Sequence, residues 1–167
     1  MKRDLDLPDP EATERLAADL AGCRPAWAVV YLEGGLGAGK STLARALLRA
    51  LGVKGAVRSP TYTLVERYPI PGGEAAHLDL YRLASAAELD FLGLDELAAD
   101  ATLWLIEWPE RGKTLLPPAD LRIQLSVHGK GRRARLRPGT QSGEAWLGRL
   151  EQAAQGTGAG QEVPRGS

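Results

Sequence analysis

The chain has 167 residues, 44% of them apolar, so it is long enough and apolar enough to fold around one core, which excludes a disordered chain. The 21 Lys and Arg residues balance 21 Asp and Glu residues, so the molecule as a whole has no net attraction for nucleic acid. The single cysteine, Cys23, excludes an internal disulfide, and no apolar run reaches the ~18–20 residues of a membrane span, so we expect a cytoplasmic protein without a membrane partner.

The first third of the chain predicts a short strand, a helix, a buried strand and a second helix. The short strand is expected at Leu5–Leu7. A helix is predicted over Pro10–Gly22, because Asp9 is a suitable N-cap and proline is favoured in a first turn. Residues 26–32 are almost continuously apolar, which is typical of a strand covered on both faces. After a glycine cluster, leucines recur at helical spacing over residues 40–51.

The rest of the chain predicts two hairpins on either side of a second buried strand. Pro-Gly-Gly and His-Gly-Lys-Gly segments supply the two turns. Gly93 is expected to interrupt the helix between the first hairpin and the buried strand. The predicted elements are strands over 62–68, 75–81, 101–108, 121–127 and 134–136, and helices over 84–97 and 140–154.

These elements predict a three-layer α/β fold over residues 1–154. The central sheet is expected to be mainly parallel, with antiparallel additions from the two hairpins. Residues 155–167 are rich in Gly and Gln and show no periodicity, so a flexible tail is expected there. The tail ends in Val-Pro-Arg-Gly-Ser, which resembles a protease cleavage sequence from an expression vector, and we exclude it from the functional argument.

The glycine cluster carries a phosphate-binding motif: a glycine, four further residues, and then Gly-Lys-Ser. Glycines let successive backbone N–H groups turn toward a phosphate, and the following helix adds its positive dipole end. The lysine supplies a cation and the serine hydroxyl can bind Mg²⁺. Because the motif follows a buried strand and opens a helix, it predicts a P-loop NTPase-like domain. The expected nucleotide-binding residues of this segment are Gly35, Leu36, Gly37, Ala38, Gly39, Lys40, Ser41 and Thr42, although Thr42 equally fits an ordinary first-turn residue.

Two carboxylates interrupt apolar strands, Asp79 in the first hairpin and Glu107 at the end of the second buried strand. A hydrolytic phosphate loop needs such an acid to hold the metal and to orient the attacking water. Burying an acid is costly without a cationic partner, so both are expected to face the nucleotide, binding Mg²⁺ with Ser41 and acting in catalysis with Lys40. The alternatives are an Asp79–Arg82 ion pair and a solvent-exposed Glu107.

The expected nucleotide is ATP. Guanine-specific switch proteins depend on an Asn-Lys-x-Asp element, and this sequence contains no asparagine. ATP and Mg²⁺ are therefore the predicted cofactors.

Further segments occur in the order typical of one family. The chain resembles the bacterial TsaE-type ATPases of the tRNA threonylcarbamoyladenosine (t6A) pathway over roughly residues 30–112. The resemblance departs from the family pattern at Gly35, where an acidic residue is usual, and at Ser41, where threonine is more common. The segments that carry it are LGAGK at 36–40, SPTYTLV at 59–65, HLDLYRL at 77–83, ELDFLG at 88–93 and IEWP at 106–109.

The resemblance implies a weak, partner-dependent ATPase that is required for t6A at position 37 of tRNA. It would act on the threonylcarbamoyl-transfer protein pair (TsaB and TsaD type) without transferring the group itself, so contact with tRNA would be indirect. Asp79 and Glu107 match the family's functional acids, Thr61 lies in a switch-like loop near the terminal phosphate, and Trp108 lies beside the nucleotide. From the residues alone, Trp108 also fits the core, and 59–61 also fits an ordinary loop.

Other functions remain open from the sequence. A compact small-molecule kinase has a similar size, but such kinases need an arginine-bearing lid, and residues 84–108 contain no arginine. A nucleotide-gated binding protein would differ from an ATPase only in rate. Alternating arginines over residues 133–137 fit either an RNA or acidic-partner surface or a solvated edge hairpin. His77 and His128 are expected to have structural or surface roles.

Overall fold

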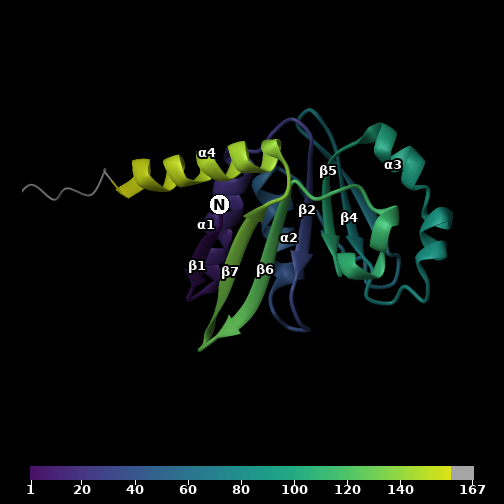
Figure 1. Cartoon of the computed structure of the whole chain (residues 1–167), viewed down its shortest axis with the longest axis horizontal. Coiled ribbons are helices and arrows are strands. Elements are labelled where there is room, and N and C mark those ends of the chain that lie inside the picture. Colours follow the sequence, from purple (N-terminus) through teal and green to yellow (C-terminus); the bar gives the residue numbers. More distant parts are fainter. Residues whose placement is uncertain (159–167) are drawn as a thin grey trace, which may run out of the picture.

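The computed structural model describes residues 1–158, which form a seven-stranded mixed sheet with helices on both faces (Figure 1). The spatial order of the strands is β1-β7-β6-β2-β5-β4-β3. The strands are β1 (Arg3–Leu7), β2 (Ala28–Glu33), β3 (Val65–Ile70), β4 (Gly73–Asp79), β5 (Ala101–Glu107), β6 (Leu121–His128) and β7 (Gly131–Pro138).

The helices form the two outer layers. One core cluster joins α1, α2 and α4 to one face of the sheet, and a second joins the 3₁₀ turn Ala86–Leu92 and α3 to the other face. Neighbouring residues of β2 and β5 alternate between the two clusters, as expected for strands covered on both sides. The helices are α1 (Pro10–Gly22), α2 (Lys40–Ala50), α3 (Leu94–Asp100) and α4 (Gln141–Gly158), with further 3₁₀ turns at Pro109–Arg111 and Lys113–Leu115.

The predicted three-layer α/β architecture is confirmed, and the sheet has a parallel centre. Strands β6, β2, β5 and β4 run parallel to one another, whereas β3, β7 and β1 pair antiparallel at the two sides. Each predicted hairpin therefore contributes one strand to the parallel centre as well as one antiparallel strand. The carboxyl ends of β2, β4 and β5 consequently meet at one edge of the sheet, which is where parallel α/β folds bind ligands.

Several predicted strand boundaries differ from the structure: the strand expected over 75–81 is Gly73–Asp79 and the one expected over 26–32 is Ala28–Glu33, and two further differences have a cause in the backbone. The strand expected from residue 62 begins only at Val65, because the Leu64 amide bonds to the Pro60 carbonyl (2.8 Å) and Leu64 adopts φ 66°. The strand expected over 101–108 ends at Glu107, because Trp108 also adopts a left-handed conformation, with φ 56°. Non-glycine residues in this region carry backbone strain of about 1–3 kcal/mol, and such strain clusters at functional sites.

At the amino end of the parallel strands, Asp120, the residue before β6, links the sheet to the C-terminal helix. Its two carboxylate oxygens accept hydrogen bonds from the Val29 amide (2.8 Å) and from the Thr140 hydroxyl (2.7 Å). These bonds link the start of β2 to the start of α4. Asp120 is 5% exposed, so both bonds lie in the interior, where such a carboxylate must be satisfied.

The alternating arginines of β7 face the acidic strand β1. Arg133 pairs with Asp6 (3.1 Å) and Arg135 pairs with Asp4 (2.9 Å), in register across the β1–β7 ladder. The side-chain amide oxygen of Gln124 accepts a hydrogen bond from Arg137 (3.1 Å). These contacts favour the solvated edge face over the RNA-binding surface.

The C-terminal helix is longer than predicted. It continues to Gly158, past the expected boundary at residue 154, and residues 159–167 of the expected tail lie outside the described residues. Within residues 1–158, no helix combines the length and the apolar character that crossing a membrane requires.

Candidate functional site

The phosphate loop occupies residues 34–39, between the carboxyl end of β2 and the first turn of α2. Gly37 and Gly39 have φ angles of 74° and 105°, in the region that favours glycine. Gly34 has φ 142°, and a Cβ there would stand 2.4 Å from the carbonyl oxygen of Leu125 in β6. The glycines therefore let the loop adopt its curve and place the N-terminus of α2 at the carboxyl edge of the sheet.

Lys40 is a buried cation at the start of α2. It is 5% exposed, and its Nζ donates hydrogen bonds to the carbonyls of Gly34 (2.6 Å) and Gly35 (2.7 Å). Nζ also lies 4.2 Å from the ring centroid of Trp108, within the range of a cation–π contact. Burial lowers the pKa of the Lys40 ammonium, and the charges of nearby carboxylates oppose that shift.

Glu107 stands opposite the first turn of α2 and is 2% exposed, so the solvent-exposed alternative is wrong. Its Oε1 accepts a hydrogen bond from the Ser41 hydroxyl at 2.8 Å. Its Oε2 lies 2.7 Å from Nε2 of His77 in β4, and because a carboxylate only accepts, the imidazole is the donor. Both oxygens of Glu107 are thus held in fixed directions.

Asp79 is the cross-strand neighbour of Glu107, at the end of β4 beside the end of β5. It is 7% exposed and accepts a hydrogen bond from the Tyr81 amide (3.0 Å), and the described residues show no ion pair between Asp79 and Arg82. Burial raises the pKa of the Asp79 carboxyl, and the charge of Glu107 adds to that rise. Two acids are therefore held side by side at the edge where the phosphate loop opens.

Asp79→Asn is expected to raise the thermal unfolding midpoint at pH 7 by about 1–3 °C. The raised pKa means that the folded state disfavours the ionised carboxylate, so the destabilisation is complete above the folded pKa and absent below the unfolded value of about 3.9. The amide oxygen can still accept from Tyr81. The gain in midpoint should shrink as the pH falls from 7 toward 4, and the exposed control Asp95→Asn should show no such trend. A lower midpoint at pH 7 would contradict this account.

A cavity of about 410 Å³, here called the main cavity, opens between the phosphate loop and the two acids. Every predicted nucleotide-binding residue except Gly35 lines this cavity. The carbonyl of Gly35 accepts a hydrogen bond from Lys40. The cavity also contains both predicted acids. The lining residues are Leu36, Gly37, Ala38, Gly39, Lys40, Ser41, Thr42, Thr61, Asp79, Tyr81, Arg82, Glu107, Trp108 and Arg132.

An aromatic pair forms one wall of the main cavity. The rings of Trp108 and Tyr81 lie 4.9 Å apart between centroids, and the Arg111 guanidinium lies 5.2 Å from the Tyr81 ring. The left-handed backbone of Trp108 turns the chain away from β5 directly after Glu107. Trp108 therefore lies at the cavity, and the 59–61 loop reaches the same cavity through Thr61.

The sequence analysis missed four residues of this site. His77 was expected in a structural or surface role and was not assigned to the site; it is completely buried and holds Glu107. Tyr81, Arg82 and Arg132 line the main cavity. His77 and Tyr81 stand two residues before and two residues after Asp79, so the alternation of a strand could have predicted that they lie on the same face as Asp79. Arg132 comes from a hairpin far along the chain, and no local sequence pattern indicates its place at the cavity.

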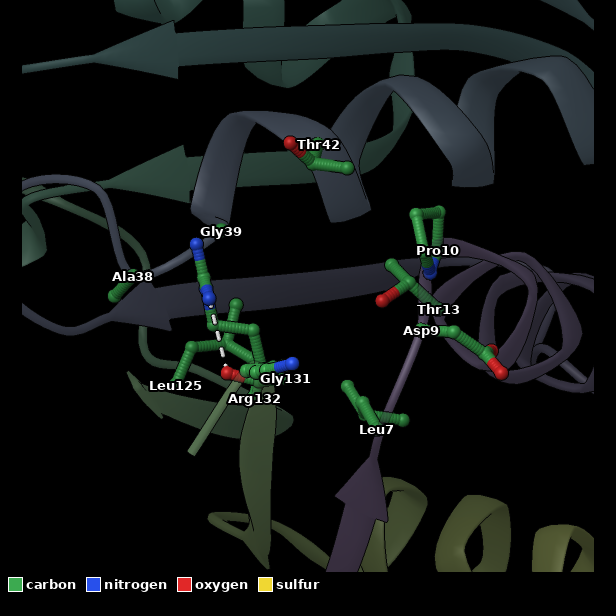
Figure 2. A pocket seen from close by; sticks show the side chains of 11 residues that line it. Leu7, Asp9, Pro10, Thr13, Ala38, Gly39, Thr42, Leu125, Gly131 and Arg132 are labelled. Carbon is green, nitrogen blue, oxygen red and sulfur yellow. Dashed lines mark hydrogen bonds between the residues drawn. The ribbon is translucent and has the colours of Figure 1, made fainter. Parts of the chain in front are cut away.

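A second cavity of about 240 Å³, here called the side cavity, adjoins the main one (Figure 2). Its walls come from the start of α1, the start of α2 and the β6–β7 hairpin. Ala38, Gly39, Thr42 and Arg132 line both cavities, so the two are neighbours across the first turn of α2. The other residues that line it are Leu7, Asp9, Pro10, Thr13, Leu125, Lys130 and Gly131.

Comparison with known proteins agrees with this geometry. The crystal structure of Bacillus subtilis YdiB matches with a TM-score of 0.77 and 25% identity, covering 92% of this chain and 97% of that one. The "tRNA threonylcarbamoyladenosine biosynthesis protein TsaE" of Haemophilus influenzae is 45% identical over 116 residues, which are 70% of this chain and 73% of that protein. The protein of the same name from Aquifex aeolicus is 37% identical over 133 residues, or 78% and 92%. A sequence model of the family described as "Threonylcarbamoyl adenosine biosynthesis protein TsaE" matches residues 7–135, and the chain belongs to this TsaE family.

Proposed function

We propose that this protein binds ATP with Mg²⁺ in the main cavity and hydrolyses it in the service of t6A synthesis on tRNA. The observation that carries the proposal is the convergence of Lys40, Ser41, Asp79 and Glu107 on one cavity at the mouth of a glycine loop. The loop and the N-terminus of α2 offer backbone N–H groups and a positive dipole to phosphates. Lys40 would exchange its two loop carbonyls for phosphate oxygens.

The donor set fits Mg²⁺, which prefers oxygen ligands. The Ser41 hydroxyl and the carboxylates of Glu107 and Asp79 would hold the ion, directly or through water. When bound, the ion would neutralise charge on the phosphate oxygens. Glu107, fixed by His77, and Asp79 would orient the attacking water and accept its proton.

The two cavities would bind opposite ends of the nucleotide. The metal-binding groups mark the terminal phosphate end, beside Thr61 in the main cavity. The side cavity, with its apolar residues Leu7, Pro10 and Leu125, would then receive the base. Thr42 lies between the two and would contact the phosphate nearest the ribose.

The biological setting follows from the relatives, which are named for tRNA threonylcarbamoyladenosine biosynthesis. The partner would be the threonylcarbamoyl-transfer protein pair (TsaB and TsaD type), with ATP hydrolysis remodelling that complex in the cytoplasm. The pairing of Arg133 and Arg135 with the acids of β1 supports an indirect contact with tRNA. The kinase alternative has no support among the relatives, which bear the biosynthesis name instead.

Calorimetry with purified protein tests the proposal. MgATP and MgADP should each bind one site and bind more tightly than MgGTP, and phosphate should be released slowly from ATP. The nucleotide should also change the tryptophan fluorescence, and Trp108→Phe should remove that change while Trp27→Phe, at an exposed site, should keep it. If no heat is detected with adenine nucleotides and Mg²⁺, or if phosphate passes to a metabolite, the proposal is wrong.

A further inference from the structure

Arg132, at the start of β7, occupies a position that neither the motif nor the family comparison assigns. It is one of four residues that line both cavities, and it is the only cation among them. Its stem runs along the phosphate loop, where its Cγ and Nε lie 3.7 Å from the point that a Cβ of Gly39 would occupy. Figure 2 shows its guanidinium reaching to the start of α2 beside Gly39.

Within residues 1–158 Arg132 has no acidic partner, unlike its strand neighbours Arg133 and Arg135. Arg133 and Arg135 each pair with an aspartate of β1, whereas Arg132 donates to the carbonyl of its own neighbour, Gly131 (2.9 Å). The carboxylate that lines the side cavity, Asp9, accepts from the Ala12 amide as the cap of α1, and in Figure 2 it lies across the cavity from Arg132.

The surroundings of Arg132 suit an anionic ligand. The N-terminus of a helix carries a partial positive charge, so a cation held against it is repelled. Lys40, in the first turn of the same helix, adds a full positive charge to the same cavity. An anion bound in this cavity would be stabilised by the half-buried guanidinium as well as by Lys40.

We infer that Arg132 binds the phosphate of the nucleotide nearest the ribose, clamping it against the first turn of α2. This inference rests on the proposed function. It follows from position: the acids and Ser41 mark the terminal phosphate end, whereas Arg132 stands at the boundary with the side cavity, beside Gly39 and Thr42. A guanidinium presents several donors in a plane and can hold two phosphate oxygens at once.

The role has a distinct kinetic consequence. A group that contacts a phosphate retained in the product stabilises bound ATP, the transition state and bound ADP alike. Removing it therefore weakens ATP and ADP by the same factor, raises KM and leaves kcat nearly unchanged. A guanidinium acting on the transferred phosphate would instead lower kcat.

The experiment compares Arg132→Ala with Arg133→Ala, its matched neighbour on the same strand, after thermal unfolding shows that both variants fold. Arg132→Ala should raise the Kd of MgATP and of MgADP by about 10- to 100-fold, the range of one charge-assisted contact, while Arg133→Ala should leave both within about twofold. Arg132→Lys, which keeps the charge without the planar fork, should fall between the parent protein and Arg132→Ala.

The outcomes separate this inference from the proposed function. If the unsubstituted protein binds no adenine nucleotide, the proposed function fails. If it binds ATP normally and Arg132→Ala binds as well as Arg133→Ala does, the inference alone is overturned. A loss confined to kcat, or equal losses in the two alanine variants, overturns it as well.

Discussion

Replacing Glu107 with glutamine is expected to slow ATP hydrolysis by at least about 100-fold while changing the Kd of MgATP by less than about fivefold. The side chain keeps its length, and its amide oxygen can still accept the Ser41 hydrogen bond that Glu107 accepts at 2.8 Å. What is lost is the negative charge and the basic oxygen held by His77 at 2.7 Å. Such a group acts mainly in the transition state, so its loss appears in kcat.

Single-turnover hydrolysis and calorimetry on the same samples measure the two quantities. Glu110→Gln is the matched control, because Glu110 is an exposed acid close enough to influence Lys40 yet lies outside the lining of the main cavity. Its hydrolysis should stay within about threefold of the parent protein. Equal rates for Glu107→Gln and Glu110→Gln would remove Glu107 from the catalytic group.

Local sequence predicted the centre of this site well. The apolar run of β2, the glycines and the leucine pattern of α2 lie together in the chain, so the strand, the loop and the helix could be inferred from spacing alone. Asp79 and Glu107 were expected to face the same place, because an acid in an apolar strand is costly to bury without a partner, and both line the main cavity. Their positions as cross-strand neighbours follow once β4 and β5 are parallel.

The parts that sequence did not predict depend on long-range contacts. The insertion of β6 beside β2 brings the β6–β7 hairpin to the phosphate loop, and this alone places Arg132 at the main cavity and the side cavity. The bond between His77 and Glu107 likewise joins positions 30 residues apart. Leu64 and Trp108 adopt left-handed backbones, which shorten two strands that β propensity favoured.

Replacing Lys40 with alanine is expected to weaken MgATP binding by about 10- to 150-fold, the equivalent of about 1.5–3 kcal/mol for hydrogen bonds to a charged group. The reason is geometric. Nζ already points into the loop, within 2.7 Å of two carbonyls that phosphate oxygens would replace as acceptors. Its pKa is lowered by burial, and a polyanion in the cavity would restore the stability of the charged form.

Calorimetry measures the Kd, and Lys54→Ala, at an exposed lysine just beyond α2, controls for the loss of one positive charge. Lys40→Met keeps the apolar stem against Trp108, so it separates lost packing from lost charge. Both Lys40 variants should bind ATP weakly and fail to restore t6A on tRNA in cells that depend on this protein, whereas Lys54→Ala should restore it. ATP affinity that survives in Lys40→Met would mean that the ammonium contacts no phosphate. An anion bound by the glycine loop would lie within reach of Lys40, so this result would also mean that the loop binds a ligand other than a phosphate.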